Sequence, residues 1–303
     1  MFFDLHSDIL YDIVLKRLDH KKNIIKDRHL PELLKGNFSG GIWCYYTDID
    51  YPLCDIERAV DYILEELESC RDIIQIVRTK DDFHDYKLNV VLGFESLQPV
   101  DTIETFEQFA RVGFRHAMLT WNEANHYGTG VDGPDHRGLT SLGKELIRYM
   151  EDHHMIIDVS HANRQTFYDI VDTTNVPLLA SHSNLNRLRH HRRNLTDDQV
   201  TKIVERGGLV GLTSVPNFTK KDSATIHDLI HHLNDYRDKN WLDHVGFGFD
   251  FMHYIDGTNI PALETPLDTP NLLKALQSEG YSEDAVNKIS SQNAIQFIKK
   301  ILQ

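Results

Sequence analysis

The chain has 303 residues and a formal net charge of -14, with 41% hydrophobic and 26% charged residues. These proportions are ordinary for a folded globular protein and exclude wholesale disorder. The acidic balance offers no broad basic surface to a phosphate backbone, so nucleic-acid binding is excluded as a class of function.

Several features bear on the compartment. No apolar run approaches the ~20 residues of a membrane-spanning helix, and the N-terminus lacks a basic region followed by an apolar signal core. The three cysteines, Cys44, Cys54 and Cys70, include no Cys-x-x-Cys pair, which disfavours a disulfide framework. We therefore expect a cytoplasmic protein with no membrane partner. Its length suits one α/β barrel, so a single domain over residues 1–303 is expected.

Eight short apolar runs predict strands. Most are nearly continuous, which is typical of parallel strands buried on both faces. The predicted strands are residues 2–8, 41–47, 89–96, 114–121, 155–161, 177–183, 208–215 and 244–251.

Segments with helical periodicity separate these runs, and several start with a helix-capping residue. Eight alternating strand and helix units predict an α/β fold, the (β/α)8 TIM barrel. A doubly wound open sheet is the alternative, although no Gly-x-Gly-x-x-Gly turn supports it. The predicted helices cover residues 55–77 and 141–150, start after Asn163 and after Thr196, and end with residues 282–301.

His6 and Asp8 end the first run at a spacing of two residues. Alternate side chains of a strand share a face, so an imidazole nitrogen and a carboxylate oxygen are directed at one point. Zinc accepts such a mixture of ligands. The pair alone is weak evidence, because a His-x-Asp pair usually lies on the surface or forms a hydrogen bond.

Later runs also end in ionisable residues, which the barrel would bring to one mouth, because barrel sites lie at the C-terminal ends of strands. Each of these residues alone could simply bind a loop amide. Several together would cost several kcal/mol each in desolvation without a cation, which favours a metal centre. They are Glu95, His161, His182 and Asp250.

Two ions fit this donor set better than one. His6 and Asp8 can hold the first ion, two of the later histidines the second, and Glu95 can bridge them. Such ions would lower the pKa of a shared water and polarise a carbonyl, which predicts hydrolysis. Asp250 is placed to transfer the proton of that water to a departing amine, with a structural role as the alternative.

Six motifs carry a resemblance to a known family. They are Asp-Leu-His-Ser-Asp at 4–8, Gly-Phe-Glu at 93–95, Asp-Val-Ser-His at 158–161, Ser-His-Ser-Asn at 181–184, Arg-Arg-Asn at 192–194 and Gly-Phe-Gly-Phe-Asp-Phe at 246–251. Together they resemble the renal (membrane) dipeptidase family, peptidase family M19 of the amidohydrolase superfamily, in its soluble bacterial form. The likeness extends from Asp4 to the final helix.

The resemblance implies a metal-dependent hydrolase barrel with two Zn2+ ions per chain. It places His6, Asp8 and Glu95 on one ion, and Glu95, His161 and His182 on the other. It makes Asp250 the catalytic acid/base.

Arg193 would bind the C-terminal carboxylate of the substrate, a role that suits the guanidinium fork. A solvated basic patch is the alternative for this arginine-rich segment.

The sequence departs from the family pattern after the fourth strand. Animal dipeptidases carry an oxyanion-stabilising histidine where this chain has Trp121 after Leu119-Thr120. His126, in the following loop, is a candidate to reach the same space, with simple solvation as the alternative. At the eighth strand, Met252-His253 follow Phe251 where the family usually has Asp-Gly, which leaves the floor of the substrate pocket unassigned.

The leading interpretation is a binuclear zinc dipeptidase that attacks dipeptides, including those with a C-terminal D-residue, with a metal-bridging hydroxide. The family also implies a homodimer. One alternative keeps the metal site but changes the substrate to another amide, a lactam or an ester. Another is a non-catalytic metal-binding barrel in which Trp121 blocks the site.

Overall fold

The computed structural model describes residues 1–47 and 55–303. Within these ranges nine parallel strands form one sheet, and eight follow the order β1-β2-β4-β5-β6-β7-β8-β9. The remaining strand, β3, pairs with the first residues of β4. The strands are β1 Phe2–Ser7, β2 Phe38–Tyr46, β3 Ile74–Ile76, β4 Leu88–Glu95, β5 Phe114–Met118, β6 Ile156–Asp158, β7 Leu179–Ala180, β8 Leu209–Leu212 and β9 Val245–Phe247.

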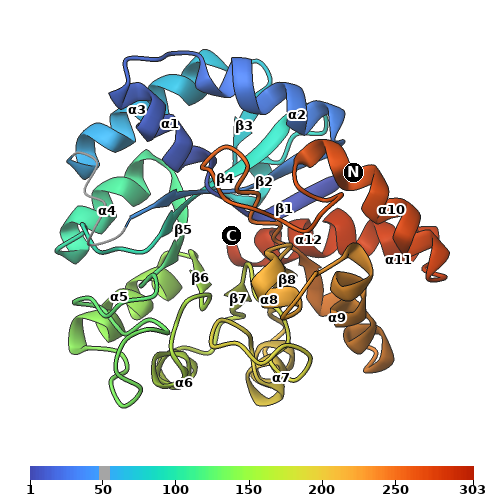
Figure 1. Cartoon of the computed structure of the whole chain (residues 1–303). Helices are drawn as coiled ribbons and strands as arrows, with labels where there is room; N and C mark the ends of the chain where they lie inside the picture. Colours follow the sequence, from blue (N-terminus) through green and yellow to red (C-terminus); the bar gives the residue numbers. More distant parts are fainter. Residues whose placement is uncertain (48–54) are drawn as a thin grey trace.

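The ring of strands nearly closes where the segment after β9 meets β1. The Asp250 amide donates to the His6 carbonyl at 3.3 Å. Asp4 Oδ1 accepts hydrogen bonds from the amides of Phe249 at 2.9 Å and His6 at 3.3 Å. With helices outside the strands (Figure 1), the nearly closed ring confirms the predicted (β/α)8 barrel, and the open sheet is wrong.

The helices alternate with the strands along the chain. Where the sequence predicted helix starts, capping side chains satisfy free backbone amides. Thr140 accepts from Gly143, and Asn163 Oδ1 accepts from the Thr166 amide at 2.8 Å. The helices are α1 Ile9–Leu18, α2 Leu30–Lys35, α3 Ile56–Ser69, α4 Ile103–Val112, α5 Ser141–Asp152, α6 Arg164–Thr173, α7 Asp197–Glu205, α8 Pro216–Thr219, α9 Ile226–Asp238, α10 Thr269–Ser278, α11 Glu283–Asn287 and α12 Asn293–Ile301.

The helix predicted over residues 55–77 is too long. α3 ends at Ser69, where the chain turns through hydrogen bonds from the amides of Ile73 and Ile74 to the Cys70 carbonyl. Ile74 then starts β3, opposite Leu88 of β4. A short apolar segment is compatible with both the helical and the strand periodicity, and here pairing with β4 makes it a strand.

The helix predicted over residues 282–301 forms as α11 and α12 joined by a wider π-helical turn at Lys288–Gln292. Asn293 follows this turn, and its side-chain amide donates to the carbonyls of Leu242 and Val245 at 2.6 and 2.8 Å. These bonds attach the final helix to the start of β9.

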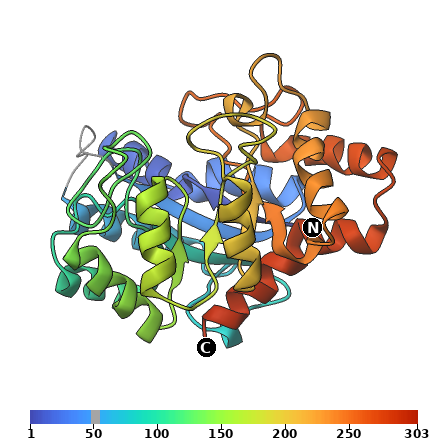
Figure 2. The same ribbon diagram turned by 90° about the horizontal axis from the view of Figure 1, so that it is seen from below.

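The apolar side of α12 covers the N-terminal end of the barrel. Phe297, Ile298 and Ile301 share a buried cluster with Phe3 and Leu5 of β1. The side view in Figure 2 shows many connecting loops gathered on one side and the C-terminus on the other. Polar residues at the strand ends therefore face the loop side.

Two further sequence expectations concern membranes and thiols. Throughout the described ranges, no helix combines the length and the apolar character that a membrane crossing requires. Cys44 and Cys70 are buried free thiols, whereas Cys54 lies outside the described residues.

Candidate metal centre

The loop side of the barrel brings the expected metal ligands together. His6 lies on β1, Asp8 directly follows this strand, and Glu95 ends β4. His161 and His182 lie in the loops after β6 and β7. All five side chains are buried, although they come from four different strand ends.

Glu95 lies between two groups of imidazoles. Its Oε2 is 3.3 Å from His6 Nε2, and its Oε1 is 2.9 Å from His161 Nε2 and 3.7 Å from His182 Nε2. The two histidine Nε2 atoms of this second group lie 2.9 Å apart. The geometry thus offers one carboxylate oxygen to each side of the site.

Two sets of donor atoms are close enough to hold a metal ion. One comprises His6, Glu95 and His182, and the other comprises His6, Asp8 and Asp250, with all donor atoms in each set within 4.8 Å of one another. His6 Nε2 is 3.7 Å from Asp8 Oδ1 and 3.9 Å from Asp250 Oδ1. The structure therefore also places Asp250, expected as the acid/base, beside the ligands.

The hydrogen bonds of His161 prepare it for a metal. Its Nδ1 is 2.8 Å from Asn122 Oδ1, an acceptor, so the ring proton is assigned to Nδ1 and Nε2 carries a lone pair. His182 Nδ1 is similarly 2.9 Å from Ser181 Oγ. Both Nε2 atoms then face Glu95 as potential ligands.

Buried atoms without hydrogen-bond partners test whether a cation fits. Among the described residues, His6 Nδ1, His6 Nε2 and Asp8 Oδ1 are buried and make no hydrogen bond. Unsatisfied buried polar atoms are costly, and a divalent cation satisfies both an imidazole nitrogen and a carboxylate oxygen. The donor set therefore fits a divalent metal.

The electrostatics lead to the same conclusion. Burial raises the pKa of Glu95 to about 8 and, together with the charge of Glu95, the pKa of Asp8 well above its usual value. Burial also lowers the pKa of His161 and His182 well below the ordinary value, which keeps both rings neutral. Crowded carboxylates beside neutral imidazoles make a site that a divalent cation stabilises.

Asp158, at the end of β6, makes hydrogen bonds to the two loops that carry His161 and His182. Its Oδ2 is 2.8 Å from His116 Nε2, and its Oδ1 accepts from the amides of Ser160 and Ser181 at 2.8 and 3.2 Å. Burial opposes ionisation, but these hydrogen bonds hold the pKa of Asp158 below its usual value. No role was predicted for Asp158 or His116, although a charged residue at the end of the apolar Ile156–Asp158 strand is a signal in the sequence.

The backbone turns sharply where the polar residues leave the strands. Positive φ angles occur at Ser96, directly after Glu95, and at His161 and Asp250, with values of 74°, 67° and 55°. Residues with side chains rarely adopt this region, and such strain gathers at functional sites. These turns aim the side chains across the mouth.

Arg193 lies beside the histidines. It is 5% exposed, its Nη2 is 3.4 Å from the His182 carbonyl, and its guanidinium lies over the Phe218 ring at 5.5 Å. Burial lowers the pKa of Arg193 to about 10, which still leaves it charged at neutral pH. The alternative that this segment is a solvated basic patch is therefore wrong for Arg193, because its side chain is buried.

The structure shows where Trp121 and His126 lie relative to the site. The Trp121 ring lies 5.7 Å from the His161 ring and 5.2 Å from that of Tyr46. His126 Nε2 is 2.9 Å from the Val100 carbonyl. Trp121 is thus a wall of the site, whereas the His126 ring is engaged with a neighbouring backbone group.

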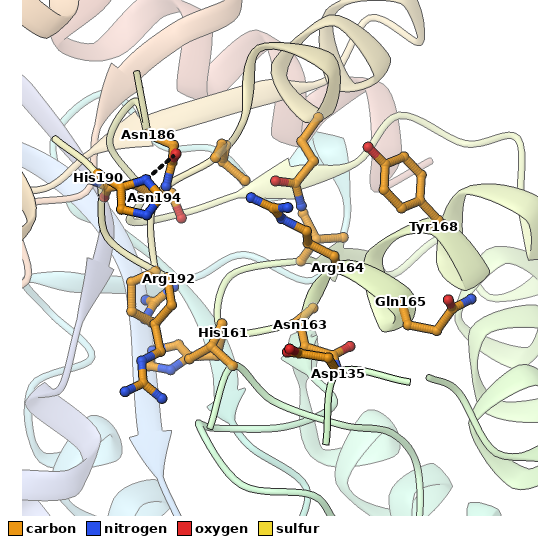
Figure 3. Close-up of a pocket in the computed structure, with 17 residues that line it drawn as sticks. Asp135, His161, Asn163, Arg164, Gln165, Tyr168, Asn186, His190, Arg192 and Asn194 are labelled. Atoms are coloured by element: carbon orange, nitrogen blue, oxygen red, sulfur yellow. Dashed lines mark hydrogen bonds between the residues drawn. The ribbon is translucent and has the colours of Figure 1, made fainter. Parts of the chain in front are cut away.

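A cavity of about 550 Å³ opens beside His161 and Arg193 (Figure 3). It extends from these residues toward the starts of α6 and α7, where Asn163 and Gln199 line it. A small ligand in this cavity can therefore lie next to His161, one of the expected metal ligands, despite Trp121.

Comparisons with known proteins agree with this arrangement. A sequence model of the membrane dipeptidase family, peptidase family M19, matches residues 1–303. Dipeptidase tcpJ of Claviceps purpurea is 25% identical over 328 residues, which cover 98% of this chain and 76% of that protein. The uncharacterized dipeptidase C965.12 of Schizosaccharomyces pombe is 28% identical over 338 residues, which cover 98% and 79%.

A solved structure has a similar fold. The crystal structure of a metallo peptidase from Rhodobacter sphaeroides, liganded with a phosphinate mimic of the dipeptide L-Ala-D-Ala, gives a TM-score of 0.87 at 22% identity. The match covers 99% of each chain. It shows that the two barrels share one fold.

Proposed function

Because the chain belongs to the membrane dipeptidase family, peptidase family M19, we propose that it is a dipeptidase that works with two zinc ions. The position of Glu95 carries this proposal. One of its oxygens faces His6, and the other faces His161 and His182. A carboxylate placed in this way is suited to bridge two cations, and the proposal takes residues 1–303 as one catalytic domain.

In this proposal His6, Asp8 and Glu95 hold one ion, and Glu95, His161 and His182 hold the other. When bound, such ions polarise a carbonyl and bring the pKa of water close to neutrality. His161 Nε2, assigned without a proton, and Asp8 Oδ1, which is buried and makes no hydrogen bond, support the assignment.

Asp250 is the proposed acid/base. Burial raises the pKa of Asp250, which favours a group that accepts a proton and returns it. The carboxylate removes a proton from the water that attacks the scissile carbonyl carbon. It then delivers this proton to the amine nitrogen as the carbon–nitrogen bond breaks.

Arg193 orients the dipeptide by binding its C-terminal carboxylate. The guanidinium is buried, charged and next to the His182 loop, so the bound carboxylate would lie close to the metal ligands. His126, the candidate to contact the substrate in place of the oxyanion-stabilising histidine, has no role in the proposed reaction because its Nε2 already faces the Val100 carbonyl.

The test combines metal analysis with a substrate panel. Zinc-loaded protein should contain two ions per chain and release free amino acids from dipeptides. Asp250→Asn should lose at least about a hundredfold in kcat, the usual range for general acid–base catalysis, while keeping its zinc. If dipeptides are inert while a lactam or ester is hydrolysed, the alternative substrate class is correct. If two ions bind and nothing is hydrolysed, the protein is a metal-binding barrel.

A further inference from the structure

The cavity beside the candidate metal centre is positively charged. Its described lining includes the arginines Arg164, Arg192 and Arg193 against one carboxylate, that of Asp135. Arg192 is paired with Asp132, which leaves two arginines against one carboxylate, in contrast with the net charge of -14 of the whole chain. The local charge therefore favours an anionic ligand on an otherwise acidic protein.

Polar atoms in the wall of this cavity are buried and unpaired. Within the described residues, Arg193 Nε, Ser183 Oγ and Asn194 Oδ1 make no hydrogen bond, although their residues are at most 5% exposed. Burying such atoms without a hydrogen-bond partner destabilises the protein, and a ligand that bonds to them removes this cost. Two of them can donate hydrogen bonds, which is what a carboxylate requires.

The far wall of the cavity adds positive potential. Arg164 occupies the first position of α6, and in Figure 3 its side chain extends from this helix toward the segment with Asn194 and His190. The positive end of the helix dipole lies at the same point. Arg192 is already paired with Asp132, so Arg164 is the more available of the two outer arginines.

We propose that this cavity selects dipeptides whose C-terminal residue is aspartate or glutamate; this inference rests on the proposed dipeptidase function. With the main-chain carboxylate at Arg193, the side chain of the same residue enters the remainder of the cavity. There a side-chain carboxylate meets Arg164 and the hydroxyl of Ser183. A cationic side chain is repelled, and an apolar one leaves the buried polar atoms unpaired.

The test compares isosteric pairs, in which only the charge differs. We expect zinc-loaded protein to cleave Ala-Asp and Ala-Glu with kcat/KM about tenfold above Ala-Asn and Ala-Gln, since hydrogen bonds between charged groups are about twice as strong as neutral ones. Both enantiomers of the C-terminal residue are assayed. The ratio should shrink as salt screens the attraction.

Two outcomes separate this inference from the proposed function. If neutral dipeptides are cleaved as well as the acidic ones, the inference is overturned and the dipeptidase function stands. If no dipeptide is cleaved, both are overturned.

Variants locate the selectivity. Arg164→Gln should bring the acid-to-amide ratio toward one, and Arg164→Glu should make Ala-Lys a better substrate than Ala-Asp. Arg111→Gln is the matched control, because Arg111 is exposed on α4, paired with Glu107, and near the end of the helix that precedes β5. A ratio that survives Arg164→Gln in a folded protein, or that falls equally in Arg111→Gln, overturns the assignment.

Discussion

Replacing Asp158 with asparagine tests how the histidine loops are held. The new amide oxygen can still accept from the amides of Ser160 and Ser181, but an NH2 group replaces the oxygen that lies 2.8 Å from His116 Nε2. If that nitrogen carries the proton, two donors then face each other. His116 can move its proton to Nδ1 only toward Cys44 Sγ, a weak acceptor 3.8 Å away.

The cost follows from these contacts. The substitution removes a buried hydrogen bond to a charged group, worth about 1.5–3 kcal/mol, and leaves a donor unpaired. We expect the free energy of unfolding, measured with urea, to fall by about 2–3 kcal/mol. The loops with His161 and His182 should also lose alignment, so zinc content after dialysis should drop before the protein unfolds.

A double-mutant cycle separates this pair from general damage. In the double variant, which combines Asp158→Asn with His116→Gln, the introduced glutamine can turn its carbonyl toward the NH2 group of the introduced asparagine and restore a hydrogen bond. The double variant should therefore be more stable than the sum of the single changes predicts, by about 1 kcal/mol. Additive effects, or an Asp158→Asn protein with unchanged stability and zinc, would refute the reasoning.

Three further predictions concern other parts of the barrel. His6→Ala should reduce the zinc content, measured by metal analysis, from two ions per chain toward one. Retention of both ions would contradict the assignment of His6 as a ligand. Gly93→Ala should destabilise the protein by about 1–3 kcal/mol, because its methyl group would overlap His116 Nδ1. Gly246→Ala should cost less, because its nearest neighbour is a methyl carbon of Leu5 at 3.2 Å. Burial lowers the pKa of His232 to about 4. Between this value and the ordinary histidine pKa of about 6.5, the unfolded state binds more protons than the folded state. The free energy of unfolding should therefore decrease as the pH falls from 6.5 toward 4. From pH 7 to pH 5 this group should cost about 2 kcal/mol, and urea titrations should show that much less pH dependence in His232→Gln.

The strands could be predicted because burial on both faces leaves a local mark in the sequence. The run at residues 177–183 shows where this information ends, since β7 itself is only Leu179–Ala180. The chain leaves the sheet before His182, and at the neighbouring loop His161 takes a φ of 67°. Hydrophobic pattern predicts burial, but not the residue at which the backbone bends.

The chain's family and barrel were determined by the sequence alone, as was the set of ionisable residues at the strand ends. The order of the motifs and the apolar runs can be read directly from the sequence, because neither depends on which residues are in contact in the folded chain. Tertiary structure decided that Glu95 presents one oxygen to His6 and the other to His161, and that Asp158 joins His116 to the loops after β6 and β7. It also formed the cavity between Arg193 and Arg164. These relations depend on barrel closure and on a few backbone angles, which bring residues distant in the sequence within hydrogen-bonding distance.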